Sequence, residues 1–266
     1  MIANYHTHTF RCGHAANVDE RVYVERAIQN GLTDFGFSEH APMPFTDKTP
    51  AANLPPLLNM RMKLHETEGY VNTLLSLRKE YKNDINIHIG FEVEYFDSCF
   101  DAFMEHISPF PIDYLILGQH FGAPESESVA HYASKFGSDG MLNQYVNDVI
   151  KGIETNKISY VAHPDMPCYV GKIEVYESEM TRLIRCANEH NVPLEMNLYG
   201  LQQIRNYPNI TFWQLANDIG CDVVIGLDAH KPENVINELA LKYANKIIES
   251  HSGLNLLEKI NFKTLK

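Results

Sequence analysis

The chain of 266 residues is 44% hydrophobic and 21% charged, and its formal net charge at pH 7 is −12. This length accommodates one α/β barrel or two smaller domains, with a sizeable core in either case. The acidic balance argues against a nucleic-acid backbone as partner, because such binding depends on Lys and Arg neutralising phosphates. Bound cations would offset part of the charge, which fits a metalloprotein and fits a plain acidic cytosolic protein equally well.

The cysteines are odd in number and include no Cys-x-x-Cys pair; they are Cys12, Cys99, Cys168, Cys186 and Cys221. This argues against a disulfide framework or a zinc ribbon and favours a reducing compartment. The chain does not open with a charged-then-apolar leader, and it contains no apolar run of about 18 residues. We therefore expect a soluble, cytoplasmic protein with no membrane partner.

The first half of the chain opens with a strand that leads to His6 and His8. Side chains two apart on a strand point to the same side, about 7 Å apart, so the two imidazoles can coordinate one ion together. The pattern then predicts helices over residues 19–30, 63–81 and 100–107, and strands over residues 33–38, 85–91 and 114–117. Residues 41–59, rich in proline, are expected to form a long irregular loop, either a flap over the site or an inert excursion.

The second half begins with a polar loop through Ser138, followed by a helix over residues 140–155 with Asp139 as its expected N-cap. Strands over residues 159–162, 192–196 and 222–227 then alternate with helices over residues 177–189, 211–219 and 233–249. Strand and helix thus alternate about seven times, which favours a parallel sheet with crossover helices.

Polar residues at the strand ends decide between an open sheet and a barrel. An open doubly wound sheet gathers function at one switch point, whereas a barrel gathers it from many strand ends. Here His, Glu or Asp ends six of the seven strands. We therefore predict an α/β fold of the TIM-like barrel type, with seven rather than eight β/α units, forming one domain over residues 1–266.

The candidate metal ligands follow these strands, and they are His6, His8, His14, His40, Glu92, His120, His163, Asp228 and His230. Imidazoles with a few carboxylates suit Zn, Fe or Mn rather than Ca or Mg. Nine ligands exceed what one ion needs, so two or three ions are implied, with a carboxylate as the natural bridge. A lone histidine at a strand end is more often a satisfied polar residue, but His-x-His and Asp-x-His together make coincidence a poor explanation. The remaining histidines are expected to be structural: His65, His88, His106, His131, His190 and His251.

These motifs resemble those of the PHP superfamily (polymerase and histidinol phosphatase), and more closely its monofunctional histidinol-phosphate phosphatases. The resemblance rests on Tyr5-His6-Thr7-His8, Cys12-Gly13-His14, Ser38-Glu39-His40-Ala41-Pro42, Gly90-Phe91-Glu92-Val93-Glu94, Leu117-Gly118-Gln119-His120, Ala162-His163-Pro164-Asp165 and Gly226-Leu227-Asp228-Ala229-His230. It covers nearly the whole chain, its motifs occur in order, and no ligand position departs from the pattern.

The resemblance implies a distorted seven-stranded β/α barrel with three divalent transition-metal ions (Zn, Mn or Fe) at the carboxyl ends of the strands. One ion would lie between His6, His8, Glu92 and Asp228; a second would take Glu92, His120 and His163; a third would take His14, His40 and His230. The implied reaction is hydrolysis of L-histidinol phosphate in histidine biosynthesis, by a hydroxide bridging the two metals that share Glu92. Glu92 and Asp228 are the expected catalytic residues, Asp228 as a possible proton donor to the leaving group.

The sequence identifies the substrate-binding residues less clearly than the metal ligands. Arg11 and Arg205 are candidates for the phosphate, because a guanidinium fork matches phosphate oxygens; either could equally be a solvated surface arginine. Asn197, at the end of the sixth strand, is a further candidate for the substrate site. Glu94 and Asp165 could receive the ammonium or imidazole of histidinol, or could orient a ligating histidine instead.

Three other functions stay open. Cys12 lies beside the site in sequence and could be a nucleophile, although the family chemistry gives it no role. The same site could act on phosphotyrosine or on a small nucleotide; a polymerase exonuclease is disfavoured by the acidic balance and by the lack of a following polymerase segment. From a different class, the chain could be a metal-binding interaction module, although degenerate copies would be expected to lose ligands.

Overall fold

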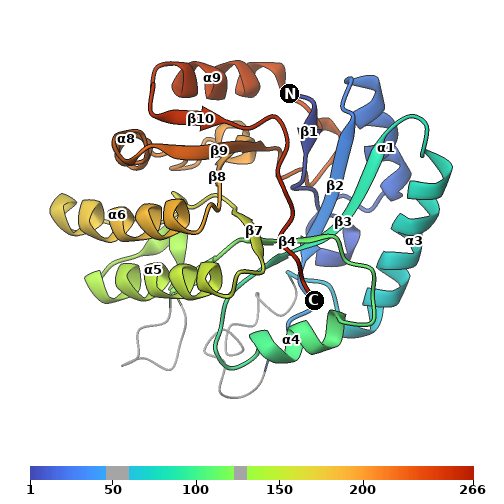
Figure 1. Ribbon diagram of the computed structural model, residues 1–266, viewed down its shortest axis with the longest axis horizontal. Helices are drawn as coiled ribbons and strands as arrows, with labels where there is room; N and C mark the ends of the chain where they lie inside the picture. The colour runs from blue at the N-terminus through green and yellow to red at the C-terminus, as the bar shows by residue number, and fades with distance from the viewer. Residues whose placement is uncertain (46–59, 123–130) are drawn as a thin grey trace.

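The computed structural model describes residues 1–45, 60–122 and 131–266. Eight parallel strands form one curled sheet in the order β1-β2-β3-β4-β7-β8-β9-β10 (Figure 1). These strands are Ala3–Asn4 (β1), Asp34–His40 (β2), Asn86–Val93 (β3), Tyr114–Leu117 (β4), Ile158–Val161 (β7), Leu194–Asn197 (β8), Cys221–Gly226 (β9) and Leu254–Leu256 (β10). A separate antiparallel pair is formed by Phe121–Gly122 (β5) and His131–Tyr132 (β6).

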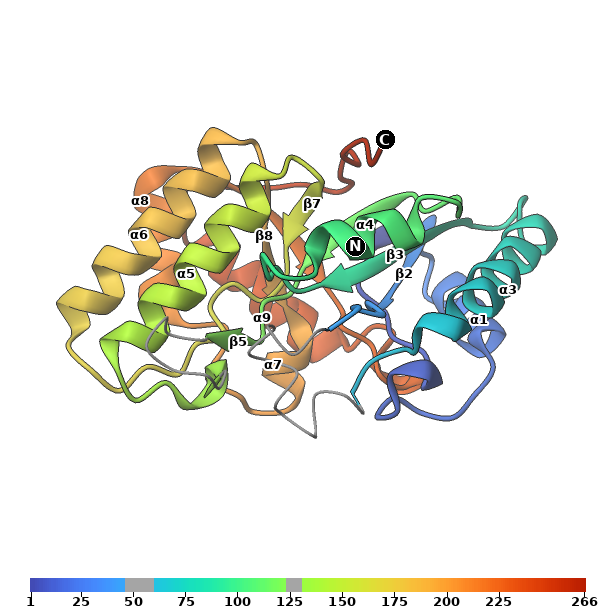
Figure 2. The ribbon, with the colours of Figure 1, turned by 90° about the horizontal axis from the view of Figure 1, so that it is seen from below.

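The helices lie on the outside of the curled sheet, with α1 and α3 on one side and α5, α6 and α8 on the other (Figures 1 and 2). Their bounds are Glu20–Gln29 (α1), Thr67–Glu80 (α3), Phe100–Ile107 (α4), Asp139–Glu154 (α5), Ile173–Glu189 (α6), Leu198–Gln202 (α7), Ile210–Ile219 (α8) and Glu238–Glu249 (α9). Short 3₁₀ turns cover Phe10–Cys12, Leu64–Glu66, Ala133–Lys135 and Pro232–Asn234. Among the described helices, none combines the length and the apolarity needed to cross a bilayer.

The ring of strands closes at its carboxyl end. Just beyond β1 and β9, Thr7 and Ala229 form a parallel bridge, and the backbone N–H of His8 donates to the carbonyl of Ala229 at 2.9 Å. At the amino end β9 pairs instead with β10, through Leu254 and Cys221. Seven β/α units followed by an eighth strand therefore make up the sheet, and the fold is a distorted TIM-like barrel as predicted.

The barrel has separate inner and outer apolar layers, because side chains alternate between the two faces of each strand. Tyr114 and Ile116 of β4 belong to the cluster inside the barrel, whereas Leu115 and Leu117 pack outward against the helices. The chain after β10 crosses the amino end, where the Phe262 ring stacks on Tyr114 with centroids 4.7 Å apart. The amino end is thereby filled, and polar side chains collect at the carboxyl end.

Several element boundaries differ from the sequence-based expectation. Ser138, not Asp139, caps α5: its hydroxyl accepts from the backbone N–H of Met141, and Asp139 is the first helical residue. Helix α6 begins four residues earlier than expected, and α9 begins at Glu238 because Asn237 caps it after a 3₁₀ turn. The short elements β5, β6, α7 and β10 were not predicted. Of the expected loop 41–59, residues 46–59 lie outside the described part of the chain.

Candidate metal centre

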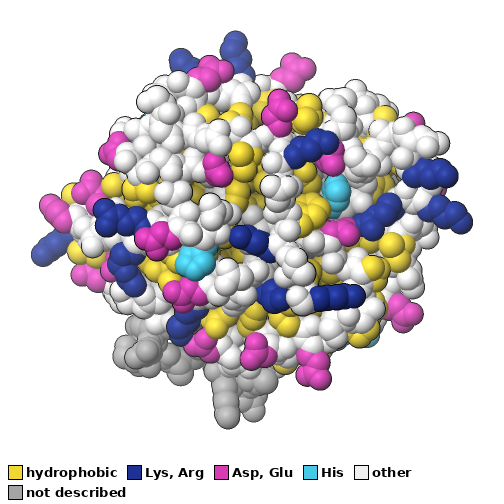
Figure 3. All heavy atoms as spheres, viewed as in Figure 1, with side chains coloured by type: hydrophobic (Ala, Val, Ile, Leu, Met, Phe, Trp, Pro, Cys, Tyr) yellow, Lys and Arg dark blue, Asp and Glu magenta, His cyan; other side chains and the backbone are white. Residues whose placement is uncertain are grey.

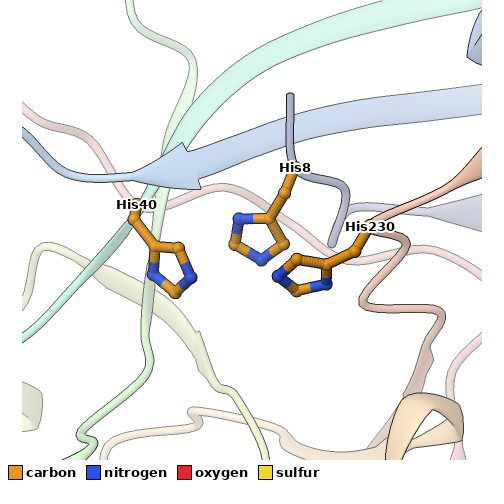
Figure 4. Close-up of side chains that lie close together, drawn as sticks. All are labelled: His8, His40 and His230. Carbon is orange, nitrogen blue, oxygen red and sulfur yellow. The ribbon is translucent and has the colours of Figure 1, made fainter. Parts of the chain in front are cut away.

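All nine predicted ligands lie together at the carboxyl end of the barrel. They come from the segments that end or follow β1, β2, β3, β4, β7 and β9, together with the turn that carries His14. Figure 4 shows His8, His40 and His230 converging from three such segments. The ring of His8 stacks between the other two, with both centroid separations 4.2 Å.

Glu92 lies at the centre of the cluster, with its two oxygens facing different histidines. Oε1 lies 2.8 Å from His163 Nε2, 3.5 Å from His6 Nε2 and 3.6 Å from His120 Nε2. Oε2 lies 2.8 Å from His40 Nδ1 and 3.6 Å from His8 Nε2. A carboxylate placed in this way can present one oxygen to each of two cations.

Gly118 makes room for this carboxylate. A Cβ at that position would lie 1.9 Å from Glu92 Oε1 and 2.5 Å from its carboxyl carbon. Only a residue without a side chain allows the Glu92 side chain to lie across the end of β4.

Asp228 provides the second acidic group, and it does so from an unusual backbone conformation. Its Oδ1 lies 3.2 Å from His8 Nε2, 3.5 Å from His6 Nε2 and 3.2 Å from His230 Nδ1. Its φ is +50°, and that of His163 is +31°. Non-glycine residues with positive φ are uncommon and concentrate at functional sites.

Five of the imidazoles are held through Nδ1. Nδ1 of His6, His8 and His120 contacts a carboxylate, that of Glu195 at 2.8 Å, Glu39 at 3.4 Å and Glu94 at 3.1 Å, respectively. Nδ1 of His14 and His230 contacts the backbone carbonyls of Cys12 and Asp228 at 3.2 and 3.0 Å. An acceptor at Nδ1 keeps the proton on that nitrogen and leaves the Nε2 lone pair for a metal.

Several of the inward-facing atoms have no hydrogen-bond partner. His6 Nε2, His8 Nε2 and Glu92 Oε2 are buried and make no hydrogen bond of good geometry among the described residues, although Glu92 Oε2 lies 2.8 Å from His40 Nδ1. Buried polar atoms of this kind are costly unless something else satisfies them. A bound cation would do so for all three, so the residues present fit a metal site.

Ligand atoms within 4.8 Å of one another form five overlapping groups, which are His6-His8-Asp228, His6-Glu92-His163, His40-Glu92-His120, His8-His40-His230 and Cys12-His14-His230. Only the first group lies within one expected ligand set. The second combines His6 of the first set with His163 of the second, and the third combines His40 of the third set with Glu92 and His120. The ligands expected for the third ion, His14, His40 and His230, do not form one group. His14 groups with Cys12 and His230, whereas His40 groups with His8 and His230.

Electrostatics keep the two acids ionised. Burial by itself raises the pKa of Glu92, but the neighbouring His40, His120 and His6 outweigh it and hold that pKa well below the usual range. Burial likewise opposes ionisation of Asp228, and His6 and His230 hold its pKa well below normal. Both carboxylates are therefore charged at neutral pH and available as ligands.

The histidines divide into two kinds. Burial and the neighbouring His230 and His8 lower the pKa of His14 to about 4, so this imidazole is neutral and can coordinate directly. Burial lowers the pKa of His6, but the carboxylates around it, with Glu195 first, raise it well above normal. A metal must displace a proton from His6, as is usual for protein ligands.

Within the described part of the chain, most of the buried acids around the cluster have histidines, and no lysine or arginine, as basic partners. Arg61 donates from Nη2 to Glu94 Oε2 at 2.7 Å. Within residues 1–45, 60–122 and 131–266, no ion pair joins a lysine or arginine to the other four, which are Glu39, Glu92, Glu195 and Asp228. Burying charges without counter-charges is unfavourable. When the imidazoles are neutral, as coordination requires, the site has a deficit of positive charge that divalent ions would offset.

A cavity of about 460 Å³ opens above this cluster. Besides several of the nine candidates, it is lined by Arg61, Glu94, Tyr132, Tyr199, Arg205 and Tyr207, among others. The guanidinium carbon of Arg205 lies 5.2 Å from the centroid of the Tyr199 ring. Two arginines and an aromatic wall thus border the space in front of the ligands, a combination suited to a small phosphorylated molecule.

The predicted substrate-binding residues differ in whether they line this cavity. Arg205 and Glu94 line the cavity, although Glu94 already contacts Arg61 and His120. Arg11 is not among the lining residues, because its guanidinium pairs with Glu20. The place of Arg11 thus gives no support for binding phosphate.

Asn197 is buried beneath the ligands, where its Nδ2 donates to Glu195 at 2.9 Å and to Asp228 at 3.2 Å, so it orients acids and does not line the cavity. Asp165 accepts from Trp213 Nε1 at 2.9 Å and from a backbone N–H, which is a structural role. The Cys12 thiol is buried and donates to the carbonyl of Thr9 at 3.2 Å. Burial raises its pKa far above the usual range, which disfavours a nucleophilic thiolate.

Sequence reasoning missed the carboxylates Glu39 and Glu195, the cation Arg61 and the tyrosines of the wall. Glu195 had a readable signal, since it interrupts an apolar strand two residues before Asn197 and so shares its face. Arg61 had none, because it directly follows the long irregular stretch.

The other histidines lie away from the cluster where they are described. His88 Nε2 contacts Asp34 at 3.1 Å near the amino end of the barrel. His106 contacts the Thr67 hydroxyl, and the rings of His190 and His251 contact carbonyls of their own helices. Nothing is described of the His131 side chain.

Comparison with known proteins places these features in a family. The PHP domain model matches residues 4–198. Histidinol-phosphatase of Bacillus subtilis (strain 168) is 29% identical over 263 residues, covering 86% of this chain and 94% of that protein. Among solved structures, histidinol phosphate phosphatase from Lactococcus lactis, complexed with zinc, L-histidinol and phosphate, superposes with a TM-score of 0.71 at 17% identity, covering 99% of this chain and 97% of that one.

Proposed function

Because the chain belongs to the PHP domain family, we propose that it is a metal-dependent phosphatase that hydrolyses L-histidinol phosphate to L-histidinol and inorganic phosphate. The observation that carries this proposal is the central position of Glu92, whose two oxygens face five imidazoles beneath a cavity bordered by arginines. The curated relative from Bacillus subtilis and the Lactococcus lactis structure, by their names, support the choice of substrate.

We infer three divalent transition-metal ions, zinc, manganese or iron, held by the nine clustered side chains. Two sites would share Glu92, one with His6, His8 and Asp228 and the other with His120 and His163; the third would take His14, His40 and His230. When bound, such ions lower the pKa of a water molecule and neutralise charge on a phosphoryl group.

Charge balance favours more than one ion. Counted with neutral imidazoles, the four carboxylates without a lysine or arginine partner among the described residues, Glu39, Glu92, Glu195 and Asp228, contribute −4, which two divalent cations would just offset. A third leaves a net charge of +2 to attract a phosphate monoester dianion. This excess fits hydrolysis of a phosphate ester better than simple metal storage.

The chain's own residues supply positioning. We assign the guanidinium of Arg205, which lines the cavity, to the phosphoryl oxygens, with Arg61 beside Glu94 as a second cation on the cavity wall. Tyr132, Tyr199 and Tyr207 offer aromatic faces to the imidazole ring of the substrate.

Asp228 is a metal ligand in this proposal, and because it is ionised it could pass a proton to the departing alkoxide only after taking one from the attacking water. Because neighbouring histidines hold the pKa of Asp228 low, the ligand role is better supported than proton donation. If Asp228→Asn retained full metal occupancy and full rate, the role of proton donor would be excluded.

The proposal is tested by phosphate release from L-histidinol phosphate, phosphotyrosine and a dinucleotide, with and without a chelator. We expect turnover of histidinol phosphate to exceed the others, to be lost on chelation and to be lost in His8→Ala. His190→Ala, on the distant end of α6, serves as the matched control. Preference for phosphotyrosine or the dinucleotide would reassign the substrate, and no release by metal-loaded protein would favour a metal-binding interaction module.

A further inference from the structure

Glu195, in the middle of β8, is fully buried inside the barrel and does not line the cavity. Its Oε1 accepts from His6 Nδ1 at 2.8 Å. Its Oε2 accepts from the backbone N–H of His163 and from Asn197 Nδ2, both at 2.9 Å. One carboxylate thus contacts residues that follow β1 and β7 and that end β8.

Each contact fixes something about a candidate ligand. By accepting a hydrogen bond from His6 Nδ1, the Glu195 carboxylate keeps the proton on that nitrogen and directs the unpartnered Nε2 toward Glu92 and Asp228. Accepting from the His163 N–H stabilises a backbone with φ of +31°. The Asn197 amide that donates to Glu195 also donates to Asp228 Oδ2 at 3.2 Å, which links Asp228 to the same carboxylate.

The surrounding backbone accommodates this arrangement. A Cβ at Gly226 of β9 would lie 1.7 Å from Glu195 Oε1, so the neighbouring strand leaves room for the carboxylate only by having no side chain there. Among the described residues, Glu195 has no lysine or arginine in an ion pair with it.

We propose that Glu195 is a positioning residue that assembles the ligands His6, His163 and Asp228 for metal binding. This inference rests on the proposed metal-dependent function and adds a residue to it. Glu195 does not touch the substrate; it sets the tautomer of one ligand, the backbone of the second and, through Asn197, the side chain of the third.

The first test is the variant Glu195→Gln. Its amide N–H group must face one of the three donors that now contact the carboxylate, which are His6 Nδ1, the backbone N–H of His163 and Asn197 Nδ2. We expect the apparent dissociation constant for zinc, measured by competition with a chromophoric chelator, to rise 10- to 100-fold, the range typical of such outer partners. Asp34→Asn is the matched control, because Asp34 is also a buried carboxylate bonded to a histidine, but at the amino end of the barrel. Affinity within twofold of wild type in a folded Glu195→Gln protein would overturn the proposal.

A second test uses the unaltered protein and so holds even if the variant does not fold. Long-range ¹H–¹⁵N spectra of the histidine rings of the metal-free protein should place a proton on His6 Nδ1, and in the zinc-loaded protein this ring should remain Nδ1-protonated with Nε2 bound. A ring protonated on Nε2 alone would overturn the proposal. Wild-type protein that binds no zinc would overturn the proposed function instead, so the two failures are distinguishable.

Discussion

Gly118→Ala is expected to disable the site although it replaces none of the candidate ligands. The new Cβ would lie 1.9 Å from Glu92 Oε1, whereas ordinary contact begins at 3.4 Å, so the carboxylate must move by the difference of 1.5 Å. A misplacement of about 1 Å at a reacting centre can cost about 100-fold in rate. We therefore expect kcat/KM to fall at least ~100-fold, equivalent to about 2.7 kcal/mol in the activation free energy.

The fold should survive this change. Overpacking of a buried site typically costs about 1–3 kcal/mol, less than the stability of most domains. The assay pairs phosphate release from L-histidinol phosphate with metal content by elemental analysis, and with circular dichroism to monitor folding. Gly118→Ala should keep its dichroism and lose both turnover and bound metal.

Gly69→Ala is the control for this experiment. Gly69 lies inside α3, and a Cβ there would meet nothing within 4 Å. The same substitution should leave turnover unchanged and add about 0.5–1 kcal/mol of stability, because alanine is the better helix former. If Gly118→Ala turned over histidinol phosphate within threefold of wild type, the central role assigned to Glu92 would be wrong.

Three further changes have expected outcomes. Arg205→Lys should raise KM for histidinol phosphate at least ~10-fold in steady-state assays, because an ammonium lacks the guanidinium fork; an unchanged KM would remove Arg205 from the phosphate site. Phe262→Ala should lower the free energy of unfolding in urea by about 2 kcal/mol, below the range for a fully buried ring because Phe262 is half-buried, and a shift under 0.5 kcal/mol would contradict its role in filling the barrel. Burial raises the pKa of Asp148 to about 7, above its ~3.9 in an unfolded chain, so stability should fall as pH rises between these values. Asp148→Asn should therefore raise Tm at pH 8 and leave it nearly unchanged at pH 4; equal shifts at both would contradict this.

Long, regular elements were predictable because their signals are local. The helix over residues 19–30 was expected with nearly its observed bounds, since Asp19 caps α1 with its side chain and Asn30 follows its last turn. The β-branched run before Glu92 likewise predicts β3. Such patterns depend on neighbours in sequence, so they can be recognised before any tertiary contact is known.

Short elements were not predictable because tertiary contacts create them. Strand β10 has three residues, of which only Leu254 is buried, and it exists because β9 offers an edge at its amino end. Strands β5 and β6 have two residues each and stabilise one another. No periodic pattern can emerge over two or three residues.

The candidate ligands were found because strand ends in a barrel converge, and a sequence shows strand ends. The carboxylates behind them are harder to recognise, since Glu39 and Glu195 each act through a residue more than 30 positions away. Their sequence signal is a charge inside a strand that otherwise reads as core. A buried carboxylate is costly without a partner, so a glutamate between Leu194 and Met196 requires a buried donor nearby. In a chain with candidate ligand histidines at other strand ends, the simplest such donor is the ring nitrogen of one of them that faces away from the cluster, as His6 shows.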